Sequence, residues 1–417
     1  MAEKEKILFI DLFAGIGGFH CALKKLNGKC VFVSEIDPLC QKTYAENFPQ
    51  CKNKIHGDIK KVKPTSIPKF DMLCAGFPCQ SFSKAGKRKG FEDEARGDLF
   101  SVTINILKNH PECKYVLLEN VKNLADNEMF WNVIVNGFSK LNYFITKEPI
   151  VLSPTDFGIP QSRDRVFILG IRKDIANENI KNNRQIALSD LDLDKFKKEI
   201  VFGDAFRILD KEYEEDLILS DEESEVLNAW DEFKKEILVK RIDAPIWMEY
   251  FGESYKTDTA FYKKVRYDSM PDWKKRFVKR NREFYVAHKE AIDLWIRKWG
   301  MKNRNKIYRK FEWNCKDDCS SLKEGIIQIR HSGVRVKRPD FYPALVAVNN
   351  TPIIWSKKYN VFRRLSVKET AKLQSFPTKY IFLGSKGEQY KQLGNSVNVN
   401  VVRYVANALI QLGKKEK

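Results

Sequence analysis

The chain has 417 residues, of which 43% are hydrophobic and 31% charged, a balance typical of a globular protein and not of a disordered one. It contains no run of 18 apolar residues, and its charged beginning does not fit a signal peptide, so we expect no membrane span and a cytoplasmic location. The nine cysteines are then expected as free thiols. The net charge of +19 favours a polyanionic partner such as nucleic acid, although solubility alone would also explain it.

The first part of the chain alternates short apolar runs with helix-like stretches. This alternation predicts an α/β fold in which a mostly parallel sheet is covered by helices on both faces. The clearest predicted strands are residues 7–13, 30–34, 70–75, 114–118 and 165–171.

Beyond residue 172 the charge rises and the alternation of strands and helices fades. Seven of the eight tryptophans lie in this later part, and residues 271–285 interleave basic and aromatic side chains, which predicts a basic amphipathic helix. The last 30 or so residues return to an apolar, helix-like pattern, after a predicted glycine turn at residues 393–395. We therefore predict a first domain of residues 1–172, completed by 388–417, and a second, smaller domain of residues 173–387.

A glycine-rich turn follows the first predicted strand, in the order Phe13-Ala14-Gly15-Ile16-Gly17-Gly18. Glycines at this position let a ligand approach the backbone, and the helix that follows offers free N–H donors. Glu35 ends the next strand, where a carboxylate can bind both hydroxyls of a ribose, and Asp58 follows a further strand. These features favour nucleoside binding over the alternative of an ordinary tight turn.

Cys79 follows Pro78 directly after the predicted strand 70–75. Ligands bind at the carboxyl ends of strands in open α/β sheets, so a cysteine in this place is a candidate nucleophile. A buried apolar thiol is the alternative, which the polar, glycine-rich neighbours disfavour. Lys87 and Arg88 lie in the basic stretch that follows, and we expect it to form a mobile loop that closes over a phosphate backbone.

Together these motifs resemble those of the DNA cytosine-5 methyltransferase family. The glycine turn and Pro78-Cys79-Gln80 are the most specific of them. The others follow in family order: Glu119-Asn120-Val121, Gln161-Ser-Arg163-Asp-Arg165, Arg363-Arg-Leu365-Ser366-Val-Lys-Glu369 with Leu373-Gln374-Ser-Phe376-Pro377, and Gly394-Asn395-Ser396-Val397-Asn-Val399. The resemblance covers residues 7–171 and 360–405 and says little about the middle of the chain.

The resemblance implies a Rossmann-like, S-adenosylmethionine-dependent methyltransferase domain and a smaller domain that contains the target-recognition region. It also implies that a methyl group passes from S-adenosyl-L-methionine to C5 of cytosine in a specific duplex DNA sequence. In this reaction the thiolate of Cys79 adds to C6 of a flipped-out base, which makes C5 nucleophilic. The group that later removes the C5 proton is left unassigned.

The resemblance further implies roles for individual residues. Glu119 would protonate N3 of the base, Arg165 would hold its O2, Arg163 would help position the loop and the base, and Asn120 would orient the proline–cysteine loop. Gln80 belongs to the same catalytic motif. The expected cofactor contacts are Phe13, Ala14, Gly15, Gly17, Gly18, Glu35, Ile36, Asp58, Ile59, Pro78, Leu99, Asn395 and Val397. The expected DNA contacts are Ser81, Ser83, Lys87 and Arg88, together with Arg335 and Lys337 from a basic, donor-rich segment that also fits a solvated hairpin.

Other functions were weighed against this one. A tRNA-methylating branch shares these motifs, but the large middle segment favours duplex DNA. A non-catalytic DNA-binding relative would be expected to lack Cys79 or Glu119, and no acidic cluster indicates a nuclease. Cys315 and Cys319 with His331 lack the second cysteine pair of common zinc sites, so no metal is expected.

The setting implied by the resemblance is a bacterial type II restriction–modification system. A cognate restriction endonuclease acting on the same site is then an expected partner, and the methyltransferase itself is expected to be a monomer. An orphan methyltransferase would have the same sequence features, and the recognition sequence is not readable from them.

Overall fold

The computed structural model describes residues 6–77, 98–239, 242, 244–252, 269–345 and 351–413, and its contacts divide the chain into two compact units. The first unit consists of Met1–Ile200, Ala344–Val348 and Thr370–Lys417. The second unit consists of Val201–Pro343 and Asn349–Glu369. Each unit is described by itself below.

These bounds differ from the predicted division of the chain. Residues 173–200 and 370–387 belong to the first unit, whereas the sequence analysis placed them in the second domain. The reason is that residue 186 is hydrogen-bonded to the edge of the first unit's sheet. The Ile186 N–H donates to the Ile145 carbonyl and the Lys147 N–H donates to the Ile186 carbonyl, both at 2.9 Å. The Ile186 side chain is fully buried. Charge and composition along the chain do not reveal such pairing.

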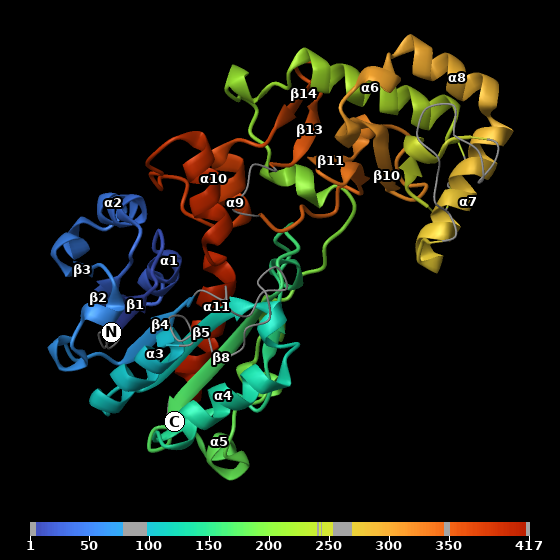
Figure 1. The fold of residues 1–417 in the computed structure, drawn as a ribbon. Helices are drawn as coiled ribbons and strands as arrows, with labels where there is room; N and C mark the ends of the chain where they lie inside the picture. The colour runs from blue at the N-terminus through green and yellow to red at the C-terminus, as the bar shows by residue number, and fades with distance from the viewer. Residues whose placement is uncertain are drawn as a thin grey trace. The chain divides into compact units, whose positions relative to one another are not determined.

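An eight-stranded mixed sheet forms the centre of the first unit (Figure 1). Its strands are β1 (Ile7–Leu12), β2 (Gly28–Ser34), β3 (Ile55–His56), β4 (Met72–Ala75), β5 (Tyr115–Val121), β6 (Tyr143–Ile145), β7 (Ile150–Leu152) and β8 (Arg165–Arg172). The order is β3-β2-β1-β4-β5-β8-β6, and β7 also pairs with β8. Strands β1 to β5 are parallel, so their carboxyl ends meet at one edge, and β8 runs antiparallel to β5. The predicted α/β class is confirmed.

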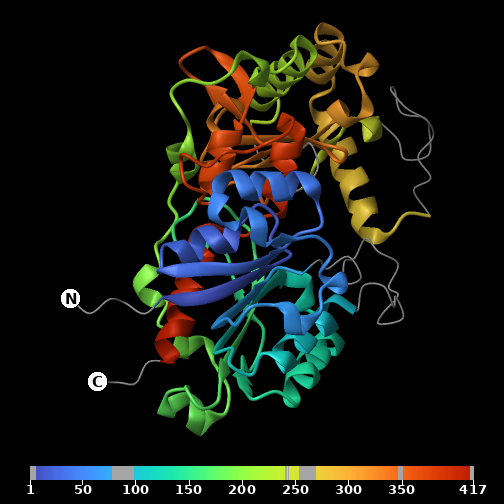
Figure 2. The same ribbon diagram turned by 90° about the vertical axis from the view of Figure 1, so that its left-hand side faces the viewer.

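Helices cover both faces of this sheet (Figures 1 and 2). The first unit contains α1 (Gly18–Lys24), α2 (Pro38–Asn47), α3 (Asp98–Asn109), α4 (Glu128–Ser139), α5 (Glu178–Asn183), α10 (Lys386–Asn395) and α11 (Val399–Leu412), and α9 (Val367–Leu373) contains the boundary between the units. Apolar residues of α3 and α4 pack with strand residues in one cluster, whereas α11 packs against α1, β5 and β8.

The predicted turn at 393–395 is wrong, because these residues form the last turn of α10. Within the described residues, every helix falls short of the length and apolar character that a membrane span needs.

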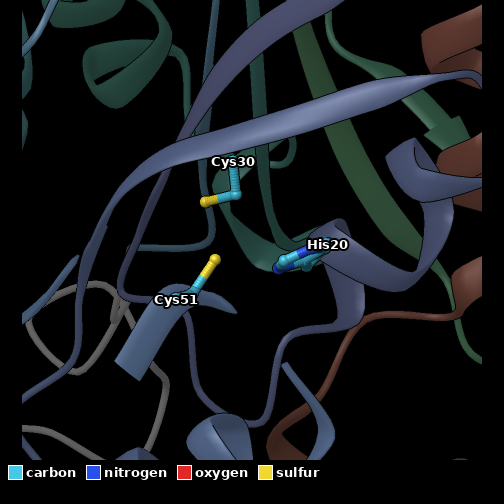
Figure 3. A group of neighbouring side chains, drawn as sticks. All are labelled: His20, Cys30 and Cys51. Carbon is cyan, nitrogen blue, oxygen red and sulfur yellow. The ribbon is translucent and has the colours of Figure 1, made fainter. Parts of the chain in front are cut away.

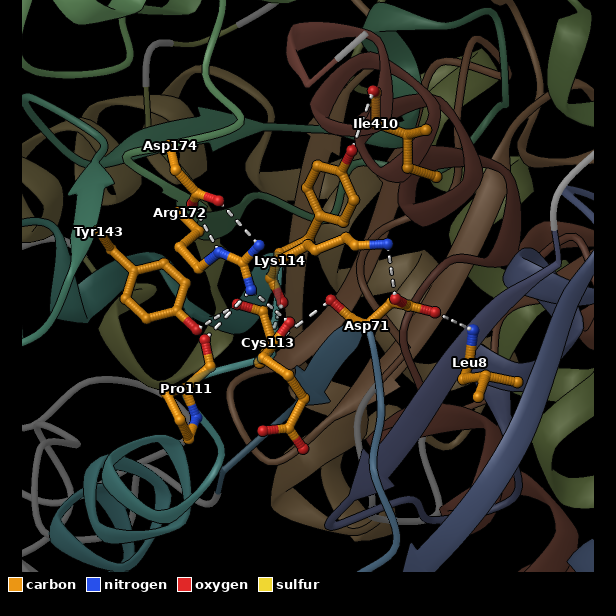
Figure 4. Close-up of polar contacts among 11 residues, drawn as sticks. Leu8, Asp71, Pro111, Cys113, Lys114, Tyr143, Arg172, Asp174 and Ile410 are labelled. Carbon is orange, nitrogen blue, oxygen red and sulfur yellow. Dashed lines mark hydrogen bonds and ion pairs between the residues drawn. The ribbon is translucent and has the colours of Figure 1, made fainter.

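A polar network ties the strands together at the edge opposite their carboxyl ends (Figure 4). Asp71 accepts the Leu8 N–H at 2.9 Å and forms an ion pair with Lys114 at 3.0 Å. Tyr143 donates its hydroxyl to the Cys113 carbonyl at 2.7 Å, and Arg172 bonds Asp174 and the carbonyls of residues 111 and 112. These contacts join β1, β4, β5, β6 and β8, and they leave the other edge of the sheet to the candidate site.

The second unit is built around a six-stranded sheet with an aromatic core. Its described elements are α6 (Asp221–Glu236), β9 (Ile246–Trp247), α7 (Asp272–Ala287), α8 (Lys289–Lys298), β10 (Lys310–Asn314), β11 (Ile326–Arg330), β12 (Gly333–Lys337), β13 (Ile353–Ser356) and β14 (Val361–Arg364). The strand order is β14-β13-β11-β12-β10-β9. The fully buried Trp230 stacks on Phe311 and donates its indole N–H to the Tyr308 carbonyl at 2.9 Å. The basic amphipathic helix predicted for residues 271–285 is confirmed as α7.

A buried ion pair holds the carboxyl-terminal end of the second unit. Arg363 on β14 donates to both carboxylate oxygens of Glu369 at 2.7 Å, and the side chains are 2% and 0% exposed. The same carboxylate accepts the backbone N–H groups of Asp210 and Ser366, each at 2.8 Å. Four hydrogen bonds therefore compensate the buried charge of Glu369.

Replacing Glu369 by glutamine is expected to lower the free energy of unfolding by about 3–5 kcal/mol, because the Arg363 charge stays buried without its counter-charge. Urea denaturation followed by circular dichroism measures this loss. Glu225→Gln is the matched control: it breaks the pair with Arg304 in which Glu225 is 53% exposed, and such surface pairs contribute about 1 kcal/mol or less. A Glu369→Gln loss no larger than that of the control would show that the buried pair does not stabilise the unit.

Candidate active site

The turn between β1 and α1 adopts a left-handed backbone at three positions, with φ of 56° at Phe13, 53° at Gly15 and 82° at Gly17. Nothing lies within 4 Å of the position that a Cβ would occupy at Gly15, so a ligand can approach the backbone there. At Gly18 the same added atom would meet Val397 Cγ2 at 2.6 Å. Gly18 is therefore required because the start of α1 touches residue 397, which the chain brings back from its carboxyl-terminal part.

Glu35 lies directly after β2 and is tied to the glycine turn. Its Oε2 accepts the Gly15 N–H at 2.6 Å, and its Oε1 accepts the Asp37 N–H at 2.8 Å. Burial raises the pKa of Glu35, and the two backbone hydrogen bonds oppose that rise. The neighbouring Ile36 is 70% exposed, which is unusual for a large apolar side chain. A carboxylate beside an open glycine turn and an uncovered isoleucine suit a ribose and a flat apolar ring.

The next acidic residue, Asp58, follows β3 at the same edge of the sheet. Its carboxylate accepts the Lys60 N–H at 3.0 Å, and the side chain is half-buried. Ile59 is 3% exposed and packs in the apolar cluster beneath, with Leu99 partly buried against the same cluster. Asp58 can therefore reach a ligand at this edge, whereas Ile59 packs into the apolar cluster below it.

Glu119 and Arg165 face each other near the ends of β5 and β8. Glu119 is 8% exposed, and its Oε1 lies 3.1 Å from Nε of Arg165. Burial raises the pKa of Glu119, while the charges of Arg165 and Arg163 lower it. A carboxyl group with a raised pKa can carry a proton to a base and donate it. The structure thus brings together two of the predicted catalytic residues.

Asn120 anchors the segment that leads to Cys79. Its Nδ2 donates to the Phe77 carbonyl at 3.0 Å, and its Oδ1 accepts the Val121 N–H at 2.8 Å. The Glu119 carboxylate lies 3.7 Å from the position that a Cβ would occupy at Gly76. The beginning of this loop is therefore fixed beside Glu119. The predicted residues Pro78, Cys79, Gln80, Ser81, Ser83, Lys87 and Arg88 lie outside the described residues.

Arg163 is buried and binds backbone, which gives it a positioning role. It donates to the carbonyls of Gly394 at 2.8 Å, Ser396 at 2.7 Å and Leu345 at 3.1 Å. This fixes the segment around Asn395 and Val397, so that Val397 lines a small cavity together with Glu119, Arg163 and Arg165. Arg163 therefore helps to hold the segment of residues 395 and 397 in the first unit.

Sequence reasoning left two other supports of this segment without a role. The Gln374 side-chain amide donates to the Leu393 carbonyl at 2.8 Å, and the backbone carbonyl of Gln374 accepts the Val399 N–H at 3.0 Å. Tyr380 donates its hydroxyl to the Ile16 carbonyl within the glycine turn. Gln374 belongs to one of the family-like motifs, which could have marked it, whereas no sequence signal marks Tyr380.

In the second unit, Arg335 and Lys337 lie on β12, which forms a hairpin with β11. The structure therefore contains the hairpin that the sequence analysis offered as an alternative for this segment. The Arg335 guanidinium is paired with Glu312 at 2.5 Å, so its charge is already partly compensated. The Lys337 ammonium lies 5.3 Å from the centre of the Phe341 ring. The prediction that both residues contact DNA stays a prediction.

The chain is similar to known proteins over nearly its whole length. The family model of C-5 cytosine-specific DNA methylases matches residues 7–411. The type II methyltransferase M.BanI of Aneurinibacillus aneurinilyticus is 32% identical over 97% of this chain and 96% of its own. M.AluI of Cellulosimicrobium cellulans is 28% identical over 96% of this chain and 91% of its own. The match to M.DsaV of Dactylococcopsis salina is 47% identical but local, and it spans 49% of that relative and 43% of this chain.

Solved structures show the same fold. DNMT2 of Spodoptera frugiperda superposes with a TM-score of 0.55 at 20% identity, over 98% of this chain and 100% of that chain. A putative DNA modification methyltransferase from a prophage of E. coli gives 0.53 at 19% identity, over 97% and 99%. The family match extends over nearly the whole sequence and includes the glycine turn, Glu119, Asn120, Arg163 and Arg165. The chain therefore belongs to the C-5 cytosine-specific DNA methylase family, and the predictions of fold class and of a DNA (cytosine-5) methyltransferase are confirmed.

Proposed function

We propose that this protein transfers a methyl group from S-adenosyl-L-methionine to C5 of cytosine in a specific duplex DNA sequence, with Cys79 as the nucleophile. One observation carries the proposal: Glu119, Arg165 and Asn120 meet beside Gly76 and Phe77, the residues that lead into Pro78-Cys79-Gln80. An acid with a raised pKa thus lies next to the start of the loop that holds the thiol.

The residues of the glycine turn fit S-adenosylmethionine. Gly15 leaves open space for the methionine part, Glu35 offers a carboxylate to the ribose hydroxyls, and the exposed Ile36 offers an apolar surface to the adenine. Asp58 lies where it can accept a hydrogen bond from the adenine amino group. When bound, the cofactor supplies an electrophilic methyl group.

The chain's own residues would then drive the change at the base. The thiolate of Cys79 forms a bond to C6, and the Glu119 carboxyl donates a proton to N3, which relieves the negative charge that the addition creates. Arg165 would bind both the Glu119 carboxylate and the base O2. Asn120 would fix the segment that leads to Cys79 through its hydrogen bond to the Phe77 carbonyl. After methylation the C5 proton leaves to a base, the sulfur–C6 bond breaks and N3 returns its proton to the Glu119 carboxylate, which frees Cys79 and restores the acid.

The second unit would contain the target-recognition region, with Arg335 and Lys337 near DNA. A flipped base costs a few kcal/mol of unstacking, and contacts to phosphates from a basic chain of net charge +19 can offset that cost. We further propose that the enzyme acts in the cytoplasm as a monomer, and that a restriction endonuclease acts on the same site.

Replacing Glu35 by glutamine is expected to weaken S-adenosylmethionine binding roughly 10- to 100-fold, because a hydrogen bond to a charged group contributes about 1.5–3 kcal/mol. Isothermal titration calorimetry measures the change. Glu46→Gln, an exposed carboxylate on α2, is the matched control and should bind as the wild type does. Equal affinities of the two variants would show that Glu35 does not contact the ribose.

The proposed reaction is tested by incubating the purified protein with tritiated S-adenosylmethionine and either unmethylated duplex DNA or tRNA. We expect label in duplex DNA only, and a Cys79→Ser variant that leaves the DNA unlabelled. Label in tRNA and none in DNA would contradict the proposal and favour an RNA methyltransferase. Binding of the cofactor without transfer to either nucleic acid would contradict the assigned activity.

A further inference from the structure

Three buried side chains that can ligate a metal lie together behind the glycine turn. They are His20 on α1, Cys30 on β2 and Cys51 on η1 (Pro49–Lys54), and their ligand atoms all lie within 4.8 Å of one another. Figure 3 shows the two sulfur atoms and the imidazole converging from three separate segments. Each residue is at most 5% exposed. Within the part of the chain that the structure describes, this is the group whose geometry could hold a metal ion.

Polar contacts arrange these side chains in an otherwise apolar interior. The Cys30 thiol donates to the Phe32 carbonyl at 3.4 Å. The Tyr44 hydroxyl lies 2.7 Å from His20 Nδ1 and 3.7 Å from Cys30 Sγ. The His20 ring stacks on a phenylalanine at 3.7 Å, which fixes its plane.

A buried acid next to this group points to a cation. Asp11 is fully buried, and its Oδ2 accepts a hydrogen bond from the Tyr44 hydroxyl at 3.5 Å. Its Oδ1 has no hydrogen-bond partner among the described residues. A buried polar atom without a hydrogen-bond partner is costly, so the unpartnered Oδ1 favours a further bound group in this interior. The chain from Asp11 through Tyr44 to His20 resembles the outer hydrogen bonds that orient histidine ligands in metal sites.

We propose that His20, Cys30 and Cys51 bind a thiophilic divalent cation, with Zn²⁺ as the probe. Two thiolates and an imidazole are preferred zinc ligands, and zinc bonds of about 2.0–2.3 Å imply ligand atoms roughly 3.3–3.8 Å apart. The observed limit of 4.8 Å requires the ligand atoms to approach one another by at most about 1.0–1.5 Å. Binding would release both thiol protons to solvent, so the cation with its two thiolates is neutral and suited to burial.

Such a site would link the three segments that carry the cofactor turn. His20 belongs to the helix that begins at the turn, Cys30 to the strand that ends before Glu35, and Cys51 to the connection toward β3. The metal would therefore be structural. The expectation from sequence that no metal binds was based on Cys315, Cys319 and His331, which lack the second cysteine pair of common zinc sites.

The test is a titration of the full-length, chelator-treated protein with Zn²⁺ and Co²⁺, followed by native mass spectrometry and by the thiolate-to-cobalt absorption band. We expect one bound ion in the wild type and at least a tenfold weaker affinity in Cys30→Ser and in Cys51→Ser. Cys21→Ser is the matched control, since Cys21 is a buried thiol on the same helix as His20 but is not among the ligands. Cys79→Ser and Cys315→Ser should also keep the ion.

A second measurement uses only the wild-type protein, so its result does not depend on whether the variants fold. In the wild type, Zn²⁺ should slow alkylation of Cys30 and Cys51, mapped by peptide mass spectrometry, and leave that of Cys40 unchanged. The proposal is overturned if the wild type binds neither ion, or if binding survives in Cys30→Ser and is lost in Cys79→Ser or Cys315→Ser. Equal alkylation of Cys30 and Cys51 with and without Zn²⁺ would overturn it as well.

Discussion

Replacing Cys79 by serine is expected to reduce methyl transfer by about 1000-fold or more, because a hydroxyl is a far weaker nucleophile toward C6 and no other group replaces it. Cofactor affinity should stay within about twofold, since the glycine turn and Glu35 are untouched. Incorporation of tritium into duplex DNA measures the first quantity, and calorimetry with S-adenosylmethionine measures the second.

Cys113→Ser is the control for this substitution. Cys113 lies before β5, at the opposite end of the strand from Glu119, and its thiol donates to the Tyr115 carbonyl at 3.3 Å, a bond that a serine hydroxyl can keep. The control should retain most of the activity. A Cys79→Ser enzyme that keeps more than about a tenth of the wild-type rate would contradict covalent catalysis at this residue.

Replacing Glu119 by glutamine is expected to lower the rate of methyl transfer by about 100- to 10,000-fold, the usual contribution of a positioned general acid. Glutamine can still donate a hydrogen bond to N3 but cannot give up a proton. Because burial raises the pKa of Glu119, the wild type should hold its proton at higher pH than an exposed glutamate does. Its rate should then fall as the pH rises through that pKa, and single-turnover rates of Glu119→Gln should lack this descending limb.

Glu112→Gln serves as the control for the second substitution. Glu112 is 33% exposed at the other end of β5, where it pairs with His110. This variant should keep both the wild-type rate and its pH profile. If Glu119→Gln also kept the descending limb, the titrating group would be another residue and the assignment of Glu119 would fail.

Much of the first unit could be predicted because its signals are local. The strands that became β1, β2, β4, β5 and β8 are continuous apolar runs, as strands buried on both faces should be. The two strands that the prediction missed, β6 and β7, have only three residues each, too few for a pattern. The two-residue strand β3 was expected only as the strand before Asp58. The glycine turn was predictable for a similar reason, because the left-handed backbone at Gly15 and Gly17 favours glycine at those two positions.

The partners of Arg163, Glu369 and Tyr380 could not be predicted, because only the folded chain brings these groups together. Arg163 binds carbonyls more than 180 positions away, and Tyr380 reaches the turn at Ile16. Glu369 belongs to a family-like motif, but only the structure shows that its carboxylate lies in a buried pair with Arg363. The domain boundaries were missed for the same reason, since pairing at a sheet edge leaves no trace in local composition.

The most direct measurement is bisulfite sequencing of DNA from a methylation-deficient host that expresses the protein, compared with a host that expresses Cys79→Ser. Our account predicts that cytosines in one short recurring sequence resist conversion in the first sample, and that every such cytosine converts in the second. Complete conversion in both samples, with a folded and cofactor-binding protein, would contradict it. Protected sites that persist in the Cys79→Ser sample would contradict it equally.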